Sequence, residues 1–170
     1  MNKNEKVKKI KIIIDYQIKS FKELHVFYDC QSLIEIDLSN FHAENVTDMS
    51  YMFSERKSLN ILNLSNFNTN KVINMSNMFH ECSSLKELNI SNFNTNNVIK
   101  MNHMFSGCSS LKVLNLSNFN TNNIKNMRSM FCGCSLLKEL NLSNFNTNYL
   151  ILKICSMVVL LIFLLFTQII

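Results

Sequence analysis

The sequence predicts an α/β solenoid whose 26-residue units each contain a strand, a turn and a short helix, with parallel strands on one face. The motif Leu-Asn-Leu-Ser-Asn-Phe, with Ile as its third residue in one copy, recurs at 62–67, 88–93, 114–119 and 140–145. A fixed period of this length is typical of solenoids. Within each unit, an alternating apolar pattern also gives way to one with helical spacing.

The same period divides the chain into segments. One column of the repeat is Phe41, Phe67, Phe93, Phe119 and Phe145, and a second is Met52-Phe53, Met78-Phe79, Met104-Phe105 and Met130-Phe131. Four full units occupy 33–58, 59–84, 85–110 and 111–136, and a fifth begins at Leu137. We therefore expect an N-terminal lead-in and capping segment at 1–32, a repeat solenoid at 33–148 and an apolar tail at 149–170.

The third unit illustrates the expected strand. Leu88 and Ile90 are apolar, whereas Asn89 and Ser91 are polar. This alternation predicts a short strand with one buried face. A single unit cannot bury enough apolar surface to offset its loss of conformational entropy, so the units must stack and share a core. We expect the Met and Phe columns to form that core, because Met is an adaptable filler of apolar interiors.

The helix is expected after the turn that follows the strand. Its apolar stripe in the third unit is Val98, Met101, Met104 and Phe105, which would span about two helical turns. Thr95, Asn96 or Asn97 would cap its N-terminus, and Gly107 or polar residues would end it.

Asparagine is the expected turn residue, since the chain has only two Gly and no Pro. Asn tolerates left-handed backbone conformations and closes turns with its own side chain. The scarcity of Gly also argues against a phosphate-binding loop or a dinucleotide fingerprint. The net charge of +5 is small and dispersed, so we expect no nucleic-acid partner.

Cysteines form another column, at Cys30, Cys82, Cys108 and Cys134, with Arg56 at the missing position. Adjacent coils of a solenoid lie about 4.8 Å apart, so disulfides between neighbouring coils are geometrically feasible. We favour buried thiols, because a column that repeats in register with the core is what small buried apolar residues produce, and free cysteine packs as such a residue. The cysteine and histidine spacings do not resemble a metal site, and we expect no metal and no cofactor.

The exposed side of the strands carries the candidate ligand-binding residues. No nucleophile, base and orienting acid recur together, so we expect no catalytic residues and no enzyme activity. Two polar rows do recur: Asn63, Ser65, Asn89, Ser91, Asn115, Ser117, Asn141 and Ser143. Solenoids bind ligands on such surfaces. The alternative interpretation is that these residues only keep the strand face soluble.

Several columns together carry a family resemblance. Residues 27–148 repeat Leu-x-x-Leu-x-Leu-Ser-x-Phe, then Asn-Val-x-x-Met-x-x-Met-Phe, then Cys-Ser-Ser-Leu. This pattern resembles the BspA-like leucine-rich repeat surface proteins, which are also found among mycoplasma-type surface lipoproteins. The resemblance implies a leucine-rich-repeat solenoid at the cell surface that binds protein or glycan ligands in adhesion, with no catalytic residues.

The two ends of the chain bear on localisation. The first residues are rich in Lys and lack the uninterrupted apolar core of a secretory signal, so we expect no signal peptide there. Leu150 to Ile170 is apolar and about as long as a membrane-spanning helix requires. It is interpreted as a membrane anchor, as an apolar segment that caps or dimerises the array, or as a repeat read in a shifted frame.

Two function classes follow from these patterns. The first is a non-catalytic repeat module that binds protein or glycan ligands at the cell surface or in association with a membrane. The second is a membrane-tethered or truncated structural fragment with no ligand of its own.

Overall fold

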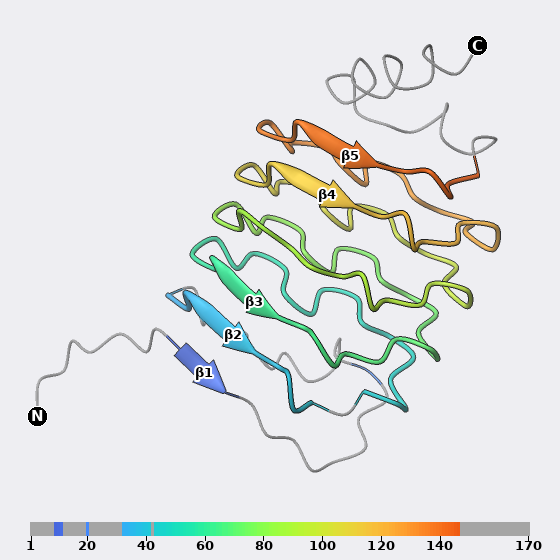
Figure 1. Ribbon diagram of the computed structural model, residues 1–170, viewed down its shortest axis with the longest axis horizontal. Helices are drawn as coiled ribbons and strands as arrows, with labels where there is room; N and C mark the ends of the chain where they lie inside the picture. Colours follow the sequence, from blue (N-terminus) through green and yellow to red (C-terminus); the bar gives the residue numbers. More distant parts are fainter. Residues whose placement is uncertain (1–8, 12–19, 21–31, 42, 147–170) are drawn as a thin grey trace, which may run out of the picture.

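A computed structural model describes residues 9–11, 20, 32–41 and 43–146, which wind into a stack of coils (Figure 1). The strands are β1 (Lys9–Lys11), β2 (Glu35–Asp37), β3 (Ile61–Asn63), β4 (Val113–Asn115) and β5 (Glu139–Asn141). They pair in parallel, in the order β1-β2-β3 and β4-β5. The coil at 87–89 runs between β3 and β4 (Figure 1). The described residues therefore confirm a repeat solenoid with parallel strands on one face.

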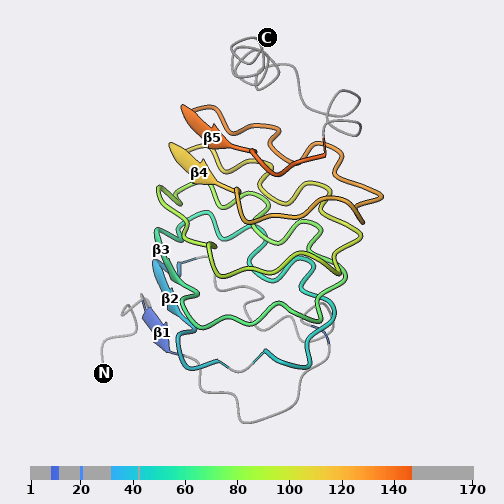
Figure 2. The same cartoon turned by 45° about the vertical axis from the view of Figure 1, so that its right-hand side comes forward.

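The sequence period is also the hydrogen-bonding register. Ile36 pairs with Leu62, and Leu114 pairs with Leu140, each 26 residues further along the chain. β1 pairs with β2 at the same interval. Each turn of the chain thus places every column of the repeat directly above its previous member, and the strands form one layer (Figure 2).

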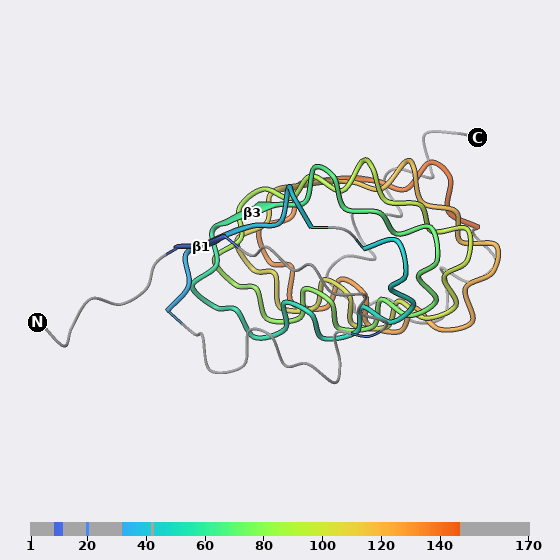
Figure 3. The same ribbon diagram turned by 90° about the horizontal axis from the view of Figure 1, so that it is seen from below.

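A second layer lies across the coil from the strands. It is marked by parallel bridges that join Ser20 to Asp48, Asp48 to Asn74, Asn74 to Lys100 and Lys100 to Asn126. Seen along the stack, the coils overlap as one flattened loop (Figure 3). The core lies between the two layers.

The expected helix at Val98–Phe105 is wrong, and with it the α/β class: no helix occurs in the described ranges. The N–H groups of Met101, His103 and Phe105 donate to carbonyls of the next coil at 2.8, 2.9 and 2.9 Å. The intervening Met104 N–H donates only three residues back, to Met101, at 3.3 Å. The segment is a series of turns bonded to its neighbours.

Coil spacing explains why these turns replace a helix. An α-helix with its side chains is about 10 Å wide. Stacked parallel strands leave only about 4.8 Å between coils. The bridges from Asp48 through Asn74 and Lys100 to Asn126 hold the second layer at strand spacing as well, so helices on successive coils would not fit there. The stripe from Val98 to Phe105 is nevertheless buried, because each short turn points an apolar side chain inward.

Left-handed backbone positions differ from the expectation for asparagine. In each coil two positions have positive φ, occupied by Tyr51, Asn77, His103 and Ser129 and by Glu55, Glu81, Gly107 and Gly133. Only one of these eight residues is Asn. Asparagine instead closes side-chain turns, as in Asn115, whose Oδ1 accepts the Ser117 N–H at 3.0 Å. Asparagine therefore closes side-chain turns as expected. The expectation that it takes the left-handed positions is wrong except at Asn77.

The Met and Phe columns form the core, as expected. Phe79 stacks on Phe53 and on Phe105 with ring centroids 5.6 Å apart in both cases, and Phe105 stacks on Phe131 at 5.8 Å. The rings of these three pairs lie within 8° of parallel. Methionines such as Met75, Met78, Met101 and Met104 are fully buried beside them. Identical side chains thus pack on one another from coil to coil.

The cysteine column consists of buried thiols at its three described members, Cys82, Cys108 and Cys134, which are not joined by disulfides. Each Sγ–H donates at 3.1 Å to a carbonyl of the preceding coil, on Phe53, Phe79 and Phe105 respectively. Burial raises the pKa of Cys82 and Cys134 to about 12 and that of Cys108 well above its ordinary value. These thiols are structural, and they are unreactive because the thiolate is the reactive form and burial disfavours it.

Arg56 occupies the same column and does not fit it. The residue is only 9% exposed. Its buried Nε and Nη1 atoms have no hydrogen-bond partner in the described part of the chain. A buried donor without a partner loses its hydration without compensation, so Arg56 is a weak point in the stack.

Candidate functional site

The predicted ligand-binding residues form two parallel rows on the strand face. The strand register sets Asn115 directly beside Asn141, and Asp37 beside Asn63. The Asn row (Asn63, Asn89, Asn115 and Asn141) is exposed throughout, and the Ser row (Ser65, Ser91, Ser117 and Ser143) is exposed except for the half-buried Ser117. The structure therefore brings all eight residues together as neighbouring rungs, which we call the strand-face rows.

Part of this surface already has a structural role. The Oδ1 atoms of Asn63, Asn89, Asn115 and Asn141 accept the backbone N–H of the serine two residues later, at 3.0–3.1 Å. Ser91 also donates its hydroxyl to Asn89 at 2.8 Å. In the part of the chain that the structure describes, the Nδ2 groups of these asparagines donate no hydrogen bond to a protein acceptor. The face therefore presents a regular line of amide donors to solvent.

A neighbouring column of asparagines, which the sequence analysis did not separate from the strand-face rows, holds the coils together. We call Asn66, Asn92, Asn118 and Asn144 the inter-coil asparagines. Asn118 donates from Nδ2 to the carbonyls of Ile90 and Phe93 on the preceding coil, at 3.1 and 2.8 Å. Asn92 does the same to Leu64 and Phe67, both at 3.0 Å. The only sequence signal for this role is the invariant Asn directly before each repeated Phe.

Buried threonines make a second set of links between coils. The Thr95 hydroxyl donates to the Asn120 carbonyl at 3.1 Å and accepts the Asn120 N–H at 2.8 Å. Thr69 makes the same pair of bonds with Asn94. These side chains are thus committed to the fold and are not available to a ligand.

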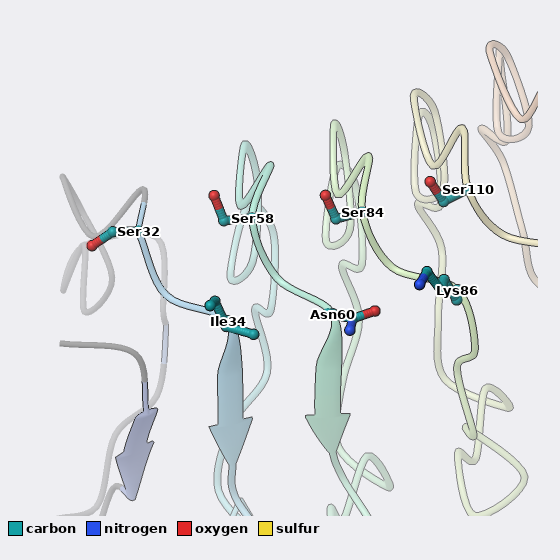
Figure 4. A pocket seen from close by; sticks show the side chains of 7 residues that line it. All are labelled: Ser32, Ile34, Ser58, Asn60, Ser84, Lys86 and Ser110. Carbon is teal, nitrogen blue, oxygen red and sulfur yellow. The ribbon is translucent and has the colours of Figure 1, made fainter. Parts of the chain in front are cut away.

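A groove that the sequence analysis missed lies where the chain enters the strands (Figure 4). Its volume is about 510 Å³, and it is lined by Ser32, Ile34, Ser58, Asn60, Ser84, Lys86 and Ser110. The four serines are one column of the repeat, and Ile34, Asn60 and Lys86 are another (Figure 4). The sequence signal was the Ser-Leu pair that recurs every 26 residues, at Ser32, Ser58, Ser84 and Ser110. We call this feature the serine groove.

Titratable groups do not assemble into a reactive centre in the described ranges. No group of three or more His, Cys, Asp or Glu residues there is placed to hold a metal ion. His80 and His103 meet edge to face with ring centroids 6.3 Å apart. Burial lowers the pKa of His103, and the nearby His80 and Arg128 lower it further. His103 therefore favours its neutral form.

The apolar tail at 149–170, with its predicted membrane contact through Leu150 to Ile170, lies outside the described residues. Among the residues that are described, no helix is long and apolar enough to cross a membrane.

The sequence of this chain matches the model of one known protein family. A family model described as "Mycoplasma protein of unknown function, DUF285" matches residues 2–113 and again residues 57–158. The two matches overlap within the repeats. Searches among curated proteins and among solved structures gave no match. Because the family matches cover most of the sequence, the chain belongs to the DUF285 family of Mycoplasma proteins.

Proposed function

We propose that this chain is a non-catalytic, BspA-like leucine-rich-repeat module that binds protein or glycan ligands in adhesion at the cell surface or in association with a membrane. One observation carries the proposal. The strand-face rows present exposed amide and hydroxyl groups on successive coils, while a different set of asparagines and threonines makes the bonds between coils. The fold therefore uses the Oδ1 atoms of the strand-face asparagines and leaves their Nδ2 donors available to a ligand.

Rigidity supports a binding role for these groups. The hydrogen bond that the Ser91 N–H donates to Asn89 Oδ1 fixes the orientation of the amide, and the Nδ2 protons of Asn89 consequently point in a defined direction. Repetition sets similar donors on neighbouring coils about 4.8 Å apart. A preorganised row loses little conformational entropy when it binds a ligand, which favours affinity through hydrogen bonds and shape.

The test compares the strand face with a matched set of asparagines elsewhere. Asn89→Ala combined with Asn115→Ala removes two exposed donors from the strand-face rows. Asn97→Ala combined with Asn123→Ala removes two exposed amides that instead donate at 2.7 Å to backbone carbonyls of the preceding coil. The probe is a printed array of extracellular-matrix proteins and glycans, followed by adhesion to cultured epithelial cells.

We expect the strand-face variant to weaken binding to the array by about 5- to 150-fold, from the loss of two hydrogen bonds of about 0.5–1.5 kcal/mol each. The control should bind like the wild type. Unchanged binding by the strand-face variant would contradict the site. Binding no stronger than background by the wild type would contradict the function and would favour the structural-fragment alternative.

A further inference from the structure

The Cys-Ser-Ser-Leu motif divides its two serines between different tasks. The first serine bonds the coils: Ser109 donates its hydroxyl to the Ser83 carbonyl at 3.3 Å, and Ser135 donates to the Ser109 carbonyl at 3.4 Å. The second serine, as in Ser84 and Ser110, lines the serine groove. Figure 4 shows this row of hydroxyls continuing through Ser32 and Ser58 across four coils. The groove thus presents one hydroxyl for each coil.

Lysines extend the groove in register with the coils. Lys86 lines it directly, and the same column holds Lys112 and Lys138 on the next two coils. All three are exposed. The Lys138 N–H donates to the Lys112 carbonyl at 2.8 Å, so the last two lie on adjacent rungs. Three ammonium groups therefore follow one another at intervals of about 4.8 Å at the backbone.

The composition of this surface indicates what it would bind. Repeated hydroxyls and regularly spaced cations suit a linear polymer that carries both hydroxyl and anionic groups. The described lining residues include no aromatic side chain on which nucleic-acid bases would stack. Ile34, at the other end of the groove, offers an apolar surface to the face of a sugar ring.

We propose that the serine groove and the lysine column bind an acidic linear polysaccharide, sulfated or uronate-bearing, that lies across the coils. Its anionic groups contact Lys86, Lys112 and Lys138, and its hydroxyls exchange hydrogen bonds with the groove serines. This inference rests on the proposed ligand-binding function and names a ligand class for a surface beside the strand-face rows.

The experiment measures binding of the full chain to immobilised heparin by surface plasmon resonance at several salt concentrations. The test variant is Lys86→Gln/Lys112→Gln/Lys138→Gln. A matched control, Lys71→Gln/Lys100→Gln/Lys125→Gln, removes the same charge from exposed lysines outside the groove and its column. Circular dichroism and the melting temperature of each variant verify folding.

We expect heparin binding to fall at least about tenfold in the test variant and less than about twofold in the control, with a weaker salt dependence only in the former. Ser84→Ala/Ser110→Ala should weaken binding severalfold and leave the salt dependence unchanged. Equal losses in test and control variants would show non-specific charge attraction and overturn the proposal.

Two further measurements are needed. One distinguishes a polysaccharide from any other polyanion, and the other distinguishes binding at the serine groove from binding at the strand-face rows. Polyglutamate that binds as tightly as heparin would overturn the assignment to a polysaccharide. Asn89→Ala/Asn115→Ala should retain heparin binding, whereas the test variant should retain binding to any array ligand that depends on the strand-face rows. Failure of one surface is therefore distinguishable from failure of the other.

Discussion

Asn118 and Asn115 lie three residues apart in the same repeat, yet the structure predicts that they contribute very differently to stability. Asn118→Ala removes the donors to the Ile90 and Phe93 carbonyls, at 3.1 and 2.8 Å. At a net worth of about 0.5–1.5 kcal/mol for each bond, the loss is about 1–3 kcal/mol of unfolding free energy. Asn118 is half-buried, so water reaches the carbonyls in part and favours the lower half of that range.

Asn115→Ala is the matched control. It removes one exposed bond, from the Ser117 N–H to Oδ1 at 3.0 Å, and exposed substitutions of this kind usually change stability by no more than about 0.5 kcal/mol. Urea unfolding followed by circular dichroism measures both variants.

Asn118→Asp refines the test through its pH dependence. The ionised carboxylate cannot donate and would face two carbonyl oxygens, so this variant should be less stable than Asn118→Ala at neutral pH and should recover as the carboxylate is protonated in acid. Equal losses for Asn118→Ala and Asn115→Ala would refute the separation between inter-coil asparagines and strand-face rows.

Three further predictions concern the core and the backbone. Arg56→Cys should raise the unfolding free energy by about 1 kcal/mol, because it removes buried unpaired donors and restores the residue type of the column; a lower urea midpoint would contradict this. Glu81→Gly should also stabilise by about 1 kcal/mol, since Glu81 has a φ of 58° where the next coil has Gly107; calorimetry that shows no gain would indicate an unstrained backbone. The buried thiols of Cys82, Cys108 and Cys134 should resist modification by dithionitrobenzoate until the chain unfolds. Because their folded pKa is raised by burial, the stability that they contribute is fully present below the unfolded pKa of about 8.5 and is lost as the pH rises from there towards about 12. A urea midpoint that increases between pH 8 and pH 9.5 would contradict that sign.

The fold was predictable as far as repetition determines it. The 26-residue interval alone sets which residues stack, and the pairing of Ile36 with Leu62 and of Leu114 with Leu140 follows it. Burial was likewise predictable, because residues such as Met101 and Phe105 repeat as apolar positions and pack on identical neighbours.

Local backbone geometry was not predictable in the same way. An apolar stripe such as Val98, Met101, Met104 and Phe105 fits a helix, but it also fits a series of short turns that each point one side chain inward. Bonds to the next coil decide between them, and the sequence contains no direct sign of these bonds. The same bonds hold Tyr51 and His103 at positive φ, where composition would favour Gly or Asn.

The candidate site was predictable only as a pattern. Its eight residues were placed on one face because strands alternate, and the structure brings them together. Asn115 and Asn118 are nevertheless the same residue type, three residues apart in one repeat. Their different roles depend on whether Nδ2 reaches the preceding coil, which requires the three-dimensional register.

The stacked-coil architecture underlies the polar rows, the groove and the stability differences, and scalar couplings across hydrogen bonds test it directly. In an isotope-labelled sample, we expect couplings from the amide nitrogen of Met101 to the carbonyl carbon of Asn126, from His103 to Arg128 and from Phe105 to Met130. Couplings from these nitrogens to the carbonyl four residues earlier would instead show a helix and would contradict the stack of coils.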